Sequence, residues 1–245
     1  MIGQASSLHY TAAVLHTPMD ISVVIPCLNE ELTIGECVQM ALQGISQSGL
    51  SGEVIVSDNG SVDKSVEISK AMGARVTHCK IPGYGAAIDH GISQSQAKIV
   101  VFADADLSYD FREIPKIIQP ILKGDADLVL GNRINQKMQL GSMPWINQKI
   151  GTPFLSFLIR KLYGIKTSDC NSGMRAILRD RYSGLNLQSP GMEFASEMLL
   201  KAARQFLKYR EVDIQFRKDQ RNRPPHLRRW RDGSRHLWII LSSKF

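Results

Sequence analysis

The chain has 245 residues, of which 43% are hydrophobic and 22% charged, and its formal net charge is +7. This length and apolar content predict one large α/β domain with a buried core, alone or with a small appendage. The four cysteines form no CxxC pair and have no histidine at ligand spacing. This pattern indicates neither a zinc site nor a disulfide framework, and it favours a reducing cytosol. No apolar run is long enough to span a bilayer, and residues 1–20 lack a signal-peptide pattern, so we expect an irregular lead-in there.

From residue 21 onward, apolar strands alternate with stretches of helical periodicity. We predict strands at residues 21–26, 53–57, 74–79, 98–103 and 126–131. We predict helices at residues 31–48, 61–72, 85–95 and 110–123. Because strands joined through helices pair in parallel, this order predicts a mostly parallel sheet flanked by helices.

The pattern loosens after residue 131, where a polar loop is predicted at 132–145. Beyond it we predict helices at 145–163 and 193–206 and strands at 173–179 and 209–216. Pro224-Pro225 breaks the chain, and an amphipathic helix is predicted at 226–241. We therefore divide the chain into a lead-in (1–20), an α/β domain (21–218) and a basic tail (219–245).

The basic residues are concentrated in the tail. Between Arg217 and Phe245, nine Lys or Arg accompany two Asp, so this segment carries the whole net charge. Such a segment indicates an anionic partner. Trp230 and Trp238 lie among its arginines, as is typical of helices at the lipid headgroup region. No nucleic-acid-binding motif is present, so we expect an anionic membrane surface and no nucleic acid, with docking of the helix on its own domain as the alternative.

Asp104-Ala105-Asp106 follows the predicted strand at 98–103. Two carboxylates at the end of a buried strand are poorly placed for stability and well placed to hold a divalent cation. Hard cations such as Mg²⁺ take oxygen ligands and keep substrate phosphates in their coordination shell. Ligands of open α/β sheets bind at the carboxyl ends of the strands. The motif therefore predicts a metal-assisted site for a phosphate-bearing substrate, with a solvated loop as the alternative.

Two further acidic side chains follow other strands. Glu30 comes after the first strand and Asp58 ends the second, and either can accept from a ribose hydroxyl or a nucleobase. Alone, Glu30 is also typical of a helix N-terminus and Asp58 of an Asx-turn. The small residues of the segment GYGAA (83–87) allow close approach of a ligand or a backbone, with a plain turn as the alternative. Because parallel strands share one carboxyl edge, we expect Glu30, Asp58 and the Asp104–Asp106 motif to lie together.

Several segments have the order and spacing of the motifs of family 2 glycosyltransferases. In the first half they are IPCLNE (25–30), VIVSDNGSVD (54–63), GYGAA (83–87) and DADLS (104–108). In the second half they are DCNSGMR (169–175), MEFASE (192–197) and RPPHLRRWRDG (223–233). Within that family the chain resembles the dolichyl- or polyprenyl-phosphate mannose and glucose synthases.

The resemblance implies a GT-A fold and an inverting, metal-dependent transfer of a sugar from a nucleotide-sugar to a polyprenyl or dolichyl phosphate. It implies a nucleotide-sugar site formed by Pro26, Leu28, Glu30, Val56, Asp58, Asp104, Ala105, Asp106, Arg221 and Arg223. It also implies that Asp104 and Asp106 hold Mg²⁺ or Mn²⁺, and that the acceptor site includes Arg133, Asp169 and Arg175. Ser108 is a departure, since many mannose synthases have a glutamine there that helps to hold the metal. Many relatives also continue into two membrane-spanning helices.

The acceptor decides whether a base is needed. A lipid phosphate has a second pKa of about 6, so at neutral pH it needs cations such as Arg133 and no strong base. A hydroxyl acceptor requires a carboxylate base, for which Glu193 and Glu197 are the candidates, with pairing to Lys201 as the alternative. The expected catalytic set is thus Asp104, Asp106, Arg133 and Glu193.

We therefore expect a polyprenyl-phosphate glycosyltransferase that binds peripherally at the cytoplasmic, inner face of the membrane. The alternatives are a soluble family 2 glycosyltransferase acting on a glycan hydroxyl and a non-catalytic membrane-surface adaptor. Asp58 can accept from uracil or guanine, so UDP and GDP both stay open, as do the sugar, the metal and the oligomeric state.

Overall fold

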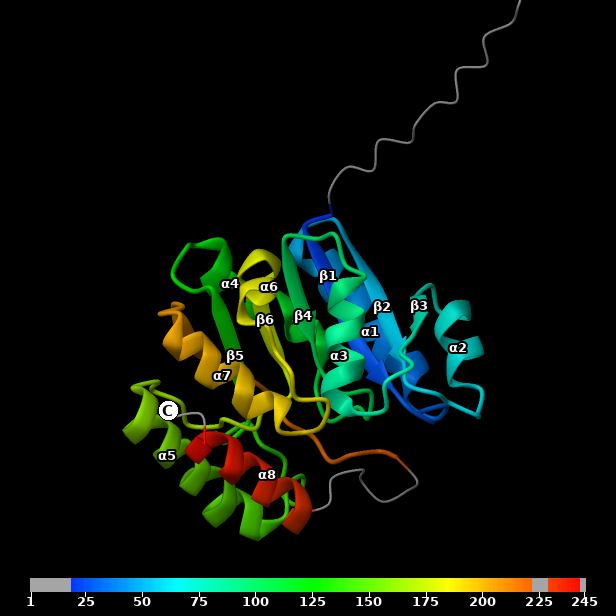
Figure 1. Ribbon diagram of the computed structural model, residues 1–245. Helices are drawn as coiled ribbons and strands as arrows, with labels where there is room; N and C mark the ends of the chain where they lie inside the picture. Colours follow the sequence, from blue (N-terminus) through cyan, green and yellow to red (C-terminus); the bar gives the residue numbers. More distant parts are fainter. Residues whose placement is uncertain (1–18, 222–228, 243–245) are drawn as a thin grey trace, which may run out of the picture.

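A seven-stranded mixed sheet forms the centre of the molecule (Figure 1). The computed structural model describes residues 19–221 and 229–242. The strands are β1 (Ile21–Cys27), β2 (Gly52–Asp58), β3 (Arg75–His78), β4 (Ile99–Phe102), β5 (Leu128–Asn132), β6 (Arg175–Leu178) and β7 (Tyr209–Asp213). Their order is β3-β2-β1-β4-β6-β5-β7, and β6 alone of these strands runs antiparallel to its neighbours. The predicted mostly parallel sheet is therefore confirmed.

Helices cover both faces of the sheet. They are α1 (Ile34–Ser48), α2 (Ser65–Ala71), α3 (Tyr84–Ser93), α4 (Ile114–Leu122), α5 (Thr152–Tyr163), α6 (Arg179–Leu185), α7 (Phe194–Arg204) and α8 (Arg229–Ser242). A short 3-10 helix, η1 (Phe111–Glu113), precedes α4, and a π-helical turn, η2 (Asn147–Gly151), precedes α5. No helix in the described segments is both long enough and apolar enough to cross a membrane.

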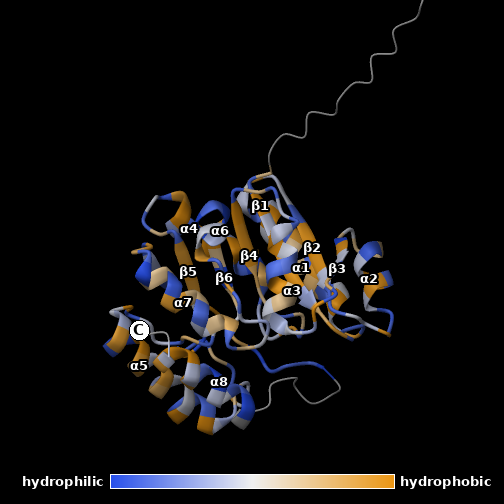
Figure 2. Cartoon of the chain, in the orientation of Figure 1, coloured by the Kyte–Doolittle hydropathy of each residue, from blue (hydrophilic) through white to orange (hydrophobic). Residues whose placement is uncertain are grey.

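Alternating side chains of the strands feed two separate hydrophobic cores. On β1, Val23 and Ile25 pack with Val38 of α1 and Ile117 of α4 on one face. Val24 belongs to the core of the other face, which α3, α5, α7 and α8 complete. This division follows the two-residue period of a strand. Figure 2 accordingly shows predominantly hydrophobic strands between helices in which hydrophobic and hydrophilic residues alternate.

The differences from the predicted elements lie mainly in the second half. The segment Arg179–Leu185 forms the helix α6, which was not predicted. The predicted strand at 209–216 ends at Asp213. The helix predicted from residue 145 does begin there, but it passes through the π-helical turn η2 before α5. In the tail, the described part of the amphipathic helix begins at Arg229, and residues 226–228 lie outside the described residues.

Helix α8 packs against its own domain. Its His236 lies 2.7 Å from the Ser196 hydroxyl of α7, and the Tyr163 hydroxyl of α5 donates to the Ile240 carbonyl over 2.7 Å. Ile240 is fully buried. The described part of the tail therefore adopts the docked arrangement that was the alternative to a free surface helix. Docking leaves its other face exposed, with Trp238 at 71%.

Candidate active site

The acidic side chains predicted to gather at the carboxyl edge of the sheet do so. In the parallel pair β1–β2, Cys27 lies opposite Asp58, and β4 pairs with β1 on its other side. The guanidinium of Arg221 connects the ends directly, because it lies 3.3 Å from Glu30 and 3.0 Å from Asp106. The parallel register thus builds one acidic edge from three strand ends, defined here as Glu30, Asp58, Asp104 and Asp106.

Asp104 is held by a residue of a different motif. The Tyr84 hydroxyl, at the start of α3, donates to its carboxylate over 2.7 Å. The main chain of Gly173 packs so closely that a Cβ there would lie 2.9 Å from the Asp104 carboxylate. Burial and repulsion from Asp106 raise the pKa of Asp104 to about 6, although the Tyr84 hydrogen bond and two arginines oppose the shift. The neighbouring arginines therefore offset the cost of this charge only in part, and a bound cation would offset more of it.

Asp106 is oriented by Ser108. One carboxylate oxygen accepts from the Ser108 main-chain N–H (3.0 Å) and from its hydroxyl (2.5 Å). The other oxygen accepts from Arg221. The residue that replaces the expected glutamine is therefore buried and hydrogen-bonded to the carboxylate, a position from which it orients Asp106.

The two carboxylates fit a hard divalent cation. Oxygen ligands suit Mg²⁺ and Mn²⁺, and such ions commonly take only one or two carboxylates and complete their shell with substrate phosphates. Among the described residues no group of three or more His, Cys, Asp or Glu side chains could hold a metal. The donor set thus fits an ion that arrives with, or is completed by, a diphosphate.

Asp58 lies at the neighbouring part of the edge. Its carboxylate accepts from the main-chain N–H groups of Gly60 and Ser61, and the exposed ring of His78 approaches it at 3.3 Å. This arrangement is the Asx-type turn considered as an alternative, and it places the carboxylate at the edge.

The other predicted donor residues differ in exposure. Pro26 and Leu28 are partly exposed, Ala105 is buried beside the carboxylates, and Val56 is fully buried in the core. The Val56 side chain therefore contributes as packing behind the edge. Arg223 lies outside the described residues.

Arg133 and Asp169 form a buried ion pair beside the acidic edge. The guanidinium makes two 2.8 Å hydrogen bonds to the Asp169 carboxylate, which also accepts from the Arg133 main chain. The guanidinium lies over the ring of Phe216, 5.1 Å from its centroid. Bidentate pairing and stacking hold this cation in one orientation.

Arg175 has a structural position. It is 1% exposed, and its guanidinium donates to three main-chain carbonyls, those of Cys170, Ser172 and Ala195. Burial lowers its pKa. These bonds shape the loop between Asp169 and β6, so the guanidinium of Arg175 is engaged by the main chain, and its acceptor role stays a prediction.

Glu193 and Glu197 have different environments. The Glu197 carboxylate accepts from the main chain of Gln188 and Ser189 and pairs with Lys201 at 2.7 Å, which is the structural alternative considered for it. Glu193 precedes α7, and one of its carboxylate oxygens lies 3.7 Å from Arg235. Its second oxygen is buried and has no hydrogen-bond partner among the described residues. Of the two, Glu193 has a carboxylate oxygen that no described residue occupies, as a general base requires.

Tyr84 and Gly173 are site residues that sequence reasoning missed. Tyr84 stands in the motif at 83–85, whose glycines were noted for close approach. A Cβ on Gly85 would lie 2.4 Å from the Ser189 carbonyl, so this glycine allows close approach of the protein main chain and not of a ligand. The tyrosine between the two glycines is the signal that could have found the contact to Asp104.

The fold and its acidic edge define a class of α/β proteins, and comparisons with known proteins show which family this is. The family model for glycosyl transferase family 2 matches residues 22–183. The low-salt glycan biosynthesis hexosyltransferase of Haloferax volcanii is 34% identical over 243 residues, covering 97% of this chain and 58% of that protein. A dolichyl-phosphate hexose transferase of the same species is 30% identical over 199 residues, covering 81% of this chain and 83% of that protein.

A solved structure supports the same assignment. Glucosyl-3-phosphoglycerate synthase from Mycobacterium tuberculosis, crystallised with Mn²⁺, UDP and glucosyl-3-phosphoglycerate, superposes with a TM-score of 0.71 at 27% identity, covering 92% of this chain and 80% of that one. The chain belongs to glycosyltransferase family 2, and the expected GT-A fold is confirmed. It spans less than two thirds of the length of the first relative above.

Proposed function

We propose that the chain catalyses inverting transfer of a hexose from a nucleotide-sugar to a polyprenyl or dolichyl phosphate at the cytoplasmic face of a membrane. The observation that carries the proposal is the juxtaposition of an acidic edge with a fixed arginine. Asp104 and Asp106 suit the donor's metal-bound diphosphate, and Arg133 beside them suits an anionic acceptor. The similarity to a dolichyl-phosphate hexose transferase supports this acceptor class.

On the donor side, Asp104 and Asp106 would hold Mg²⁺ or Mn²⁺, which when bound acts as a Lewis acid toward the departing diphosphate. Asp58 and Glu30 would accept from the base and the ribose, next to Pro26 and Leu28. The structural neighbour crystallised with Mn²⁺ and UDP supports this donor class.

On the acceptor side, Arg133 would bind the phosphate. Asp169 uses only part of the hydrogen-bonding capacity of this guanidinium, which has five N–H donors. The guanidinium donates to Asp169 through Nε and Nη2, and the third hydrogen bond comes from the Arg133 main chain. An ionised phosphate is itself the nucleophile, so no residue has to remove a proton. Glu193 would become necessary only for a hydroxyl acceptor.

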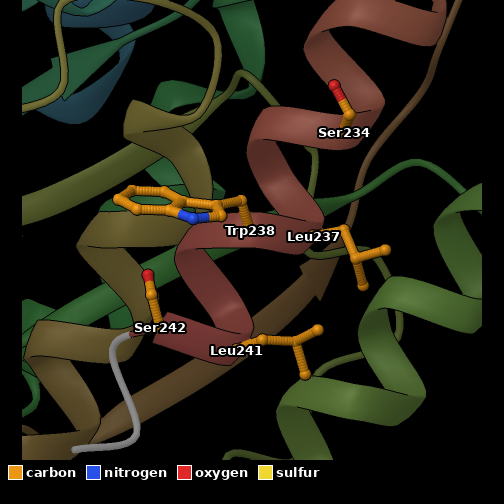
Figure 3. Close-up of a pocket in the computed structure, with 5 residues that line it drawn as sticks. All are labelled: Ser234, Leu237, Trp238, Leu241 and Ser242. Carbon is orange, nitrogen blue, oxygen red and sulfur yellow. The ribbon is translucent and has the colours of Figure 1, made fainter.

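The membrane part of the proposal rests on exposed apolar side chains near the carboxyl edge. In Figure 1, α5 and α8 lie together beyond the carboxyl ends of the strands. Large apolar side chains project from this region: Trp145, Ile146, Ile150, Phe154, Phe157, Trp238 and Leu241. Figure 3 shows Trp238 on one side of α8 and Leu237 and Leu241 on the other, around a shallow hollow. Apolar groups with neighbouring lysines and arginines are typical of proteins that bind anionic lipid surfaces.

A transfer assay tests the proposal. The purified chain is incubated with labelled UDP-glucose, UDP-N-acetylglucosamine or GDP-mannose, a short polyprenyl phosphate and Mn²⁺, and label entering the organic phase is counted. We expect transfer from one donor, its loss with EDTA and its loss in Asp106→Asn. Near-normal turnover of Glu193→Gln would support the phosphate acceptor, since no base is then required.

Two results would contradict the proposal. Transfer to a soluble glycan acceptor but not to polyprenyl phosphate would favour the soluble glycosyltransferase. Vesicle binding without thermal stabilisation by any nucleotide-sugar would favour the non-catalytic adaptor, because a ligand that binds the folded state must stabilise it.

A further inference from the structure

We propose that Arg221 occupies the metal-facing oxygen of Asp106 while the donor site is empty, and that the incoming divalent ion displaces it. The inference rests on the metal-dependent donor site proposed above and adds a competition within it. Its consequence is that the ion binds tightly only together with the nucleotide diphosphate, which receives the displaced guanidinium.

The contacts of Asp106 create the competition. One of its carboxylate oxygens already accepts two hydrogen bonds from Ser108, so the second oxygen is the better one for a cation. The Arg221 guanidinium lies 3.0 Å from that second oxygen, and its side chain is only 14% exposed. A guanidinium and a divalent ion cannot share this position, because two positive charges at such short range repel strongly in a partly buried site.

The main chain of Arg221 is fixed, whereas its guanidinium is held in the described structure by the side-chain carboxylates of Glu30, Asp106 and Asp219. Asp219 accepts from the Arg221 main chain (2.7 Å) and from its guanidinium (2.7 Å). The main chain just before it is fixed to the Asp104–Asp106 loop, since Gln220 donates to the Asp106 carbonyl and Arg217 to the Ser108 carbonyl. A swing of the side chain is therefore sufficient for displacement.

The displaced guanidinium has a defined destination. Its backbone remains pinned beside Asp106, so its free N–H groups stay within reach of the ion's other ligands. A nucleotide diphosphate bound to that ion presents oxygens that accept bidentate hydrogen bonds from arginine. The exchange therefore converts one arginine–carboxylate pair into a metal–carboxylate contact and an arginine–phosphate contact.

Direct Mn²⁺ binding tests this exchange. The free Mn²⁺ signal in electron paramagnetic resonance is titrated with the wild-type chain, Arg221→Gln and Arg217→Gln, each with and without UDP or GDP. Arg217 is the matched control, since it pairs with Asp110 at 2.7 Å rather than with the acidic edge. We expect Arg221→Gln to bind Mn²⁺ alone about 10-fold more tightly than wild type and to gain less from the nucleotide. Arg217→Gln should match wild type.

Further variants separate occupancy from charge and from misfolding. Arg221→Lys keeps the charge without the fork that spans Glu30 and Asp106, so its Mn²⁺ affinity should lie between those of wild type and Arg221→Gln. Asp106→Asn in either background should remove the binding and thereby locate the ion. Equal Mn²⁺ affinity of wild type and Arg221→Gln would overturn the displacement alone. No Mn²⁺ binding by any variant, with either nucleotide, would overturn the metal-dependent donor site as well.

Discussion

Single residues at the acidic edge show a conflict between stability and binding. Asp104 is partly buried beside Asp106, and the hydrogen bond from Tyr84 does not cancel the cost of its charge. The sequence placed both carboxylates at a strand end, because residue spacing is enough for that. It did not show Tyr84 or the Asp169 partner of Arg133, because those contacts join segments far apart in the chain.

Asp104→Asn should stabilise the protein at neutral pH and abolish transfer. The pKa of Asp104 is raised to about 6 from 3.8, so its ionised form is the disfavoured one in the folded state. The gain from Asn should grow between pH 4 and 6, stay constant above, and reach about 2–3 kcal/mol. Urea unfolding at several pH values measures it, with exposed Asp125→Asn as the control. An Asn variant less stable than wild type at pH 7.5 would contradict this explanation.

Arg133→Lys should weaken acceptor use selectively. Lysine cannot make the bidentate pair with Asp169 or keep the orientation over Phe216. We expect the KM for polyprenyl phosphate to rise about 10- to 100-fold, while stabilisation by the donor nucleotide is unchanged. Exposed Arg210→Lys serves as the control, and an equal loss of donor binding would argue against an acceptor role for Arg133.

At the scale of elements, strands were easier to predict than their directions. The apolar runs of β1, β2 and β4 identify buried strands, but an apolar run has no direction, so the antiparallel β6 was not foreseen. Helix α6 was missed because Arg179–Leu185 is short and mostly polar. Docking of α8 was weighed only as an alternative, since an amphipathic pattern does not reveal what covers its apolar face.

Protonation of His236 should loosen the docking of α8. Burial, with a smaller contribution from Arg175, lowers its pKa to about 4 against the effect of Asp232, so the folded state holds it neutral. The unfolded chain binds a proton at a pKa of 6.5, so stability is lost as pH falls from about 6.5 to about 4, by about 3 kcal/mol. His236→Gln should flatten this part of the pH–stability curve relative to His90→Gln, and an unchanged slope would contradict the prediction.

At the scale of the whole molecule, the acidic edge and the exposed apolar side chains face the same end. In the proposed function, this arrangement would let a lipid acceptor present its phosphate to Arg133 while its chain stays in the membrane. Composition does not reveal which apolar residues are exposed. Helices α5 and α8 each carry both buried and exposed apolar side chains.

Trp238→Glu should weaken binding to vesicles containing anionic lipids. Trp238 is 71% exposed on α8, so the change removes an apolar contact and adds repulsion without opening the core. We expect about 10-fold weaker partitioning in a sedimentation assay, and transfer to lipid acceptors should fall in parallel. Leu122→Glu, 54% exposed at the end of α4, is the control. Equal binding of both variants would place the lipid contact elsewhere.

The reversed direction of β6 has a mechanical consequence. Because β6 runs opposite to β4 and β5, its first residue lies at the carboxyl edge of the sheet, and the loop with Asp169 and Gly173 enters the strand there. The strand is hydrogen-bonded on both sides, so the sheet anchors the end of this loop. Helix α5 is hydrogen-bonded to that same loop through Ser156, which contacts Ser168 and Cys170. Helix α8 is joined to α7 by His236 and to α5 by Ile240. In the proposed membrane-bound state, the sheet would therefore maintain the spacing between the acidic carboxylates and Arg133 while the helices contact the bilayer.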